Sequence, residues 1–71
     1  MVHEYLKSLL ASINRQRVIS QTAVKLCDNI LKFDTRDREA IRTRKKALKK
    51  IAKLDALEKE VIKAFEKYIS D

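Results

Sequence analysis

The 71-residue chain contains neither glycine nor proline. These two residues supply most tight turns and sharp helix stops in proteins. The commonest residues of the chain, among them Leu, Lys, Ala, Glu, Arg and Ile, are mostly strong helix formers. A β-sheet fold would have no turn chemistry to use, so the sequence predicts an all-α protein that is helical nearly throughout.

The length of the chain predicts one domain, residues 1–71, with a small core and marginal stability. The single cysteine, Cys27, excludes an internal disulfide, and one His with one Cys cannot build a zinc site. Oligomerisation is the remaining common way to stabilise so small a protein, so we expect a homodimer. We expect no cofactor.

Apolar residues recur at helical spacing along two seams in the first half of the chain. The first seam reaches Ile13, and the second runs from Ile19 to Phe33 after a step of six residues. Gln16 and Ser20 fall where the first seam would otherwise continue. We interpret them as an exposed interruption, with a polar layer that sets helix register as the alternative.

The clearest boundary lies at Asp34 and Thr35, because either side chain can cap a following helix. Asp37 and Glu39 would then place negative charge in the first turn, where the helix dipole favours it. We therefore expect a first helical unit over 2–33, a turn at 34–35 and a second unit over 36–70.

Two arrangements fit this layout. The first is a hairpin of two long helices, whose dimer would form a four-helix bundle. The second is four short helices in two stacked pairs. In either arrangement we expect a kink or a new helix start near 53–55, where Asp55 and Glu58 have the spacing of a capping box. The apolar pattern allows both.

Each arrangement resembles a known family. The apolar positions of the two halves coincide at an offset of 35 residues, which is close to the period of the tetratricopeptide repeat, so the four-helix arrangement resembles that family. Ala23, Asp34, Ala40 and Ala64 lie near small or turn positions of the motif, although its Gly, Trp/Tyr and Pro are absent. The hairpin is similar in size and layout to the small Rop-type RNA-binding hairpins of plasmids.

The positive charge of the chain is concentrated between residues 36 and 53, which hold nine basic and two acidic side chains, against a net charge of +7 for the whole protein. On a helix turning by about 100° per residue, seven of the nine share one flank, while Ile41, Leu48 and Ile51 face inward. The seven are Arg38, Arg42, Lys45, Lys46, Lys49, Lys50 and Lys53. We expect this flank to bind the phosphates of duplex DNA or structured RNA, because no aromatic residue accompanies it for stacking on single strands.

A second set of residues is predicted to form the oligomer interface. Arg44 points inward between apolar neighbours and could reach a carboxylate such as Asp28 across the interface, or extend over the end of the core. The predicted interface residues are Arg44, Leu54, Leu57, Val61, Phe65 and Tyr68.

The sequence contains no arrangement of residues that predicts catalysis, such as paired carboxylates, a nucleophile with a base, or a glycine-rich phosphate loop. It also has no apolar run long enough to span a membrane and no secretory signal, so we expect a soluble intracellular protein in the cytoplasm, nucleoid or nucleus. These features predict a non-enzymatic, regulatory or accessory nucleic-acid-binding protein. The alternative is a helical adaptor or assembly subunit whose basic face docks an acidic protein.

Overall fold

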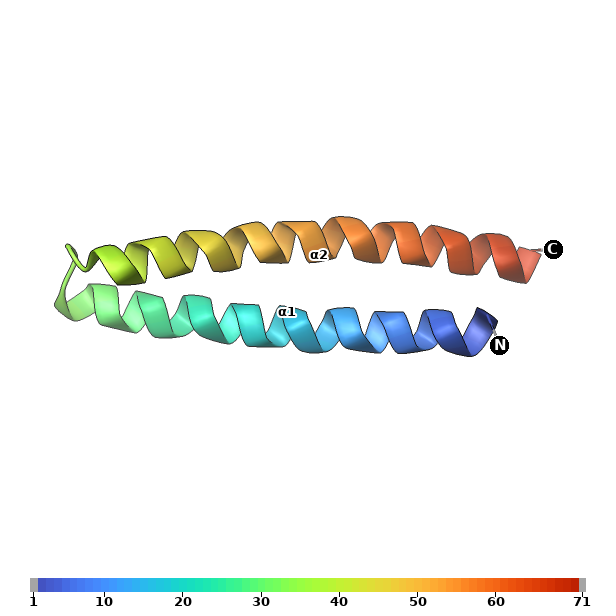
Figure 1. Cartoon of the computed structure of the whole chain (residues 1–71), viewed down its shortest axis with the longest axis horizontal. Helices are drawn as coiled ribbons and strands as arrows, with labels where there is room; N and C mark the ends of the chain where they lie inside the picture. Colours follow the sequence, from blue (N-terminus) through green and yellow to red (C-terminus); the bar gives the residue numbers. More distant parts are fainter. Residues whose placement is uncertain (1, 71) are drawn as a thin grey trace.

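A computed structural model of the chain describes the backbone of residues 2–70 and the side chains of residues 3–68. Two helices, α1 (Val2–Phe33) and α2 (Arg38–Ser70), lie antiparallel, with both termini at one end and the turn at the other (Figure 1). The predicted all-α hairpin of two long helices is confirmed. The four-helix alternative is wrong, because α2 continues without interruption through residues 53–55.

The turn between the helices uses aspartate side chains in place of glycine. At the end of α1 the Asp34 N–H donates to the Ile30 carbonyl oxygen at 2.9 Å. The Asp34 carbonyl oxygen then accepts from the Asp37 N–H at 3.3 Å, and its carboxylate Oδ1 accepts from the Arg36 N–H at 3.1 Å. No residue in the described part of the chain has a positive φ. The turn therefore needs no glycine, because the carboxylate satisfies a backbone donor locally.

Asp37 caps α2. Its Oδ1 accepts from the Ala40 N–H at 3.0 Å, and its carbonyl oxygen accepts from the Ile41 N–H at 3.1 Å in the first helical hydrogen bond. This is N-cap geometry, in which the side chain satisfies a donor that the helix itself leaves unpaired. The cap is thus Asp37 and neither Asp34 nor Thr35, and α2 begins two residues later than the sequence predicted.

The buried side chains of both helices repeat every seven residues. A strict seven-residue repeat keeps one face of each helix turned toward its partner and produces a left-handed supercoil. The buried positions are Leu6, Ile13, Ser20 and Cys27 in α1, and Ala40, Ala47, Leu54 and Val61 in α2.

The core differs between the two halves of the hairpin. Near the termini, Leu6, Ile13, Leu54 and Val61 form an apolar cluster that Leu9, Leu10 and Phe65 extend. Toward the turn, the buried positions hold only Ser20, Cys27, Ala40 and Ala47. Because apolar burial stabilises in proportion to area, most of the hydrophobic stabilisation within one chain comes from the half nearer the termini.

The structure places two predicted seams differently from the sequence analysis. Ser20 is 5% exposed, whereas Ile19 beside it is 69% exposed, so the polar residue continues the core and the second seam of α1 faces outward. In α2 the buried seam runs through the alanines, and Ile41 and Leu48 are 46% and 42% exposed at its edge.

An ion-pair network joins the middle of α1 to α2. The Arg17 Nε lies 3.0 Å from Asp55 Oδ1, and its Nη2 lies 2.8 Å from Glu58 Oε2. Only 18% of the Arg17 side chain is exposed. The close ion pair with Glu58, with a smaller contribution from Asp55, raises the pKa of Arg17 above its ordinary value, against the opposing effect of desolvation.

Candidate functional site

The seven predicted cations lie together on the outer face of α2, and we call this set the basic face. Each of the seven side chains is exposed, while Ala40, Ala47 and Leu54 of the same helix are buried against α1. Since residues three or four apart share one side of a helix, most of the basic face lies away from the core, whereas Lys50, three residues from Ala47 and four from Leu54, lies at the edge between them. The basic face contains Arg38, Arg42, Lys45, Lys46, Lys49, Lys50 and Lys53.

Carboxylates within the chain do not neutralise the basic face. No member forms an ion pair with a carboxylate among the described residues. The sequence holds no Asp or Glu between Glu39 and Asp55, and Asp55 is engaged by Arg17. The basic face is therefore an exposed surface that carries only positive charge. Its lysines at i,i+4 spacing repel each other.

The densest part of the basic face surrounds a shallow surface hollow. Lys46, Lys49, Lys50 and Lys53 line it. Their spacing of i, i+3, i+4 and i+7 places four ammonium groups on two successive turns of one helix side. Such a group of point charges suits an anion with several oxygens, such as a phosphate.

Arg44 lies apart from the basic face. Its Nε donates to Asp28 Oδ1 of the same chain at 2.7 Å, and both side chains are about half exposed. The carboxylate that the sequence analysis named as a partner across an interface is thus reached within the hairpin.

The structure also locates the other predicted interface residues. Leu54 and Val61 are buried between α1 and α2, and Phe65 packs against them, with its ring centroid 4.6 Å from that of His3. Leu57 and Tyr68 are 44% and 59% exposed. The role of these residues in an oligomer stays a prediction, although three of them already pack within one chain.

The sequence did not predict two features of the structure. The Arg17 network has no local signal in the sequence, because its partners lie about forty residues away. The outward-facing seam of α1 was visible as an apolar pattern from Ile19 to Phe33, but the sequence did not show that this seam faces away from α2.

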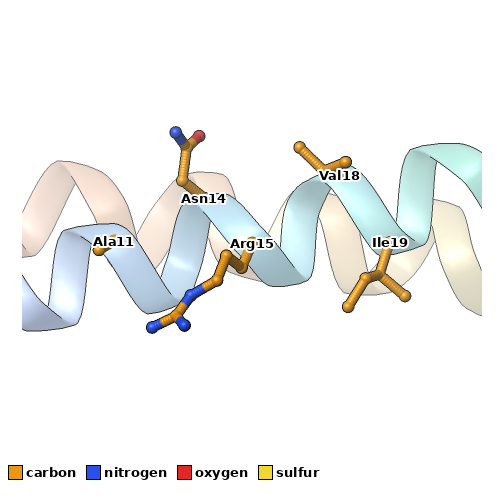
Figure 2. A pocket seen from close by; sticks show the side chains of 5 residues that line it. All are labelled: Ala11, Asn14, Arg15, Val18 and Ile19. Carbon is orange, nitrogen blue, oxygen red and sulfur yellow. The ribbon is translucent and has the colours of Figure 1, made fainter.

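The surface of α1 offers no enclosed site at the hollow drawn in Figure 2. Asn14 and Val18 point to one side of the helix, while Arg15 and Ile19 point to the other, so their side chains diverge. Among the described residues, no three His, Cys, Asp or Glu side chains form a group that could hold a metal ion. The described helices also contain no apolar stretch that could cross a membrane.

No protein-family model, no curated protein and no solved structure matches the chain. Function is therefore inferred from the charge and geometry of its surfaces. The basic face of α2 is the most distinctive of these.

Proposed function

We propose that the protein is a non-enzymatic nucleic-acid-binding protein that holds duplex DNA or folded RNA against the basic face of α2, in a regulatory or accessory role. The observation that carries this proposal is the set of seven exposed, unpaired cations on one side of one helix. From Arg38 to Lys53 the face extends about 22 Å along the helix, which is long enough to follow several phosphates of one duplex strand.

The composition of the face favours phosphate contacts. Five of its members are lysines and two are arginines. Lysine acts as a flexible point charge, whereas reading of guanine depends mainly on bidentate side chains such as arginine. We therefore expect the protein to bind through the backbone of the nucleic acid, with little preference for sequence.

The aromatic residues favour a duplex over a single strand. Phe65 packs against the core, and Tyr5 and Phe33 belong to the other helix. No aromatic residue lies between Arg38 and Lys53. Because single-strand binding sites usually stack bases on aromatic rings, a surface of lysines and arginines without aromatic rings fits the regular phosphate array of a double helix better.

Fluorescence anisotropy with four labelled ligands tests this proposal. The ligands are a DNA duplex, a folded RNA hairpin, a DNA single strand of equal length and an unrelated acidic protein, each titrated over a range of salt. We expect the duplex or the hairpin to bind tightest, with log affinity falling by about 0.9 per neutralised phosphate for each unit of log salt. Absence of nucleic-acid binding at low salt would refute the proposal, and preferred, salt-tolerant binding of the acidic protein would favour the adaptor alternative.

A further inference from the structure

Helix α1 has a second apolar face that the hairpin leaves mostly exposed, although Leu9 on it also packs against the core. Its members are spaced alternately four and three residues apart, interrupted only at Ser12 and Gln16, which hydrogen-bond to each other at 3.3 Å. Phe33 is 94% exposed, Ile19 69% and Leu26 58%. We call this face the α1 stripe, and it comprises Tyr5, Leu9, Ile19, Ala23, Leu26, Ile30 and Phe33.

The angular position of the α1 stripe around the helix would allow a second helix to pack against it. At about 100° per residue, the centre of the stripe lies about 90° around α1 from the buried positions that pack on α2. Helices in a four-helix bundle contact two neighbours on faces separated by roughly a quarter turn. Helix α1 thus has two apolar faces in bundle geometry, and only one is used within the chain.

The exposed area of the chain leaves room for a dimer interface. The hairpin is 54 Å long but only 15 and 13 Å across in Cα extents, and it exposes 6004 Å². A compact monomer of 8.3 kDa would expose about 4,600 Å², so roughly 1,400 Å² is in excess. A stable interface buries about 800 Å² on each partner.

The uninterrupted part of the α1 stripe lies along the half of the hairpin whose core buries only small side chains. This part, from Ile19 to Phe33, lies in the half nearer the turn. In that half the buried positions between the helices hold only small side chains. Packing a partner there would bury large apolar residues where the single chain buries few.

The distribution of charge is compatible with a second copy of this chain as the partner of the α1 stripe. The α1 stripe contains no charged residue, so it offers nothing specific to an acidic or basic partner. The basic face would oppose packing of α2 on α2 between two copies, because like charges would meet. A copy of the stripe is apolar, equally long and self-complementary when turned by a two-fold axis.

We propose that two copies associate through their α1 stripes, with the two α1 helices antiparallel and Ile19, the midpoint between Tyr5 and Phe33, at the two-fold axis. In this arrangement Tyr5 of one copy lies near Phe33 of the other. Both basic faces remain on the outside, where they are free to bind.

Sedimentation equilibrium without nucleic acid tests the association. We expect a mass of about twice 8.3 kDa at micromolar concentration. The double variant Leu26→Glu, Ile30→Glu should lose the dimer, because buried carboxylates have no partner there. The control Val18→Glu should keep it, since Val18 is also apolar and 56% exposed but lies off the stripe. A wild-type monomer at high micromolar concentration would overturn the proposal.

Disulfide cross-linking gives a result that does not depend on the folding of the charged variant. In a Cys27→Ala background, which removes the one native thiol, Ile19→Cys should form a covalent dimer under mild oxidation. Val18→Cys should not, because its side chain points to the other side of α1 (Figure 2). Equal cross-linking at both positions, or none at Ile19→Cys, would contradict the two-fold arrangement.

Discussion

Two aspartates build the turn between α1 and α2. Asp34 closes the turn by accepting the Arg36 N–H, and Asp37 begins the next helix by accepting the Ala40 N–H. The negative charge of Asp37 also lies at the positive end of the α2 dipole, close to the first cations of the basic face. Single side chains thus supply the turn and the helix start that glycine and proline often provide.

The capping role of Asp37 predicts the effect of its removal. Asp37→Ala should lower the free energy of unfolding by about 1 kcal/mol, because the Ala40 N–H loses its acceptor. Asp37→Asn should retain most of the stability, since asparagine caps equally well. Urea denaturation followed by circular dichroism measures both changes. Thr35→Ala serves as the control, and an equal loss there would show that the cap is placed wrongly.

Helix α2 combines a packing face with a face of repelling charges. Its N-terminal half carries the whole basic face on one side and the small Ala40 and Ala47 on the other. Like charges at i,i+4 spacing destabilise a helix by a few tenths of a kcal/mol for each pair. The helix therefore gives up stability to keep this charge pattern in the free protein.

Neutralising part of the basic face should stabilise the protein. The triple variant Lys46→Gln, Lys49→Gln, Lys53→Gln removes four repulsive i,i+4 pairs and should raise the free energy of unfolding by about 0.5 to 1.5 kcal/mol at low salt. The matched control Lys32→Gln, Lys59→Gln, Lys63→Gln removes the same charge from exposed positions outside the face. Chemical denaturation compares the two, and a loss of stability in the first variant would show that these lysines have a structural role.

The sequence predicted that the chain is helical, but it did not predict which face of each helix is buried. Missing glycine and proline predicted a helical chain, and the capping residues Asp34 and Thr35 indicated the turn, but the apolar spacing allowed four short helices as well as two long ones. Periodicity found both seams of α1, yet it could not show that Ser20 would be buried and Ile19 exposed, because each lies on a regular stripe. The choice depends on α2, whose alanines allow a close approach beside the small Ser20 and Cys27. The shared flank of the seven cations was predictable, because it follows from the geometry of a single helix and does not depend on how α1 packs.

Over the whole molecule, core, charge and exposed apolar surface are separated. The large core residues gather near the termini, whereas the basic face and the uninterrupted part of the α1 stripe lie toward the turn. These two surfaces belong to different helices. A partner chain on α1 and a nucleic acid on α2 could therefore be held at the same time.

The most direct test of nucleic-acid binding by α2 compares the salt dependence of duplex DNA affinity for the wild type and the two lysine-to-glutamine triple variants. Both variants lower the net charge from +7 to +4. If the basic face holds the phosphates, the log–log slope of the Lys46, Lys49, Lys53 variant should be smaller in magnitude by about 2.7, that is 0.9 for each lost contact. The slope of the Lys32, Lys59, Lys63 variant should stay close to that of the wild type. Equal slopes in the two variants would show that net charge alone matters and would contradict a phosphate-binding face on α2.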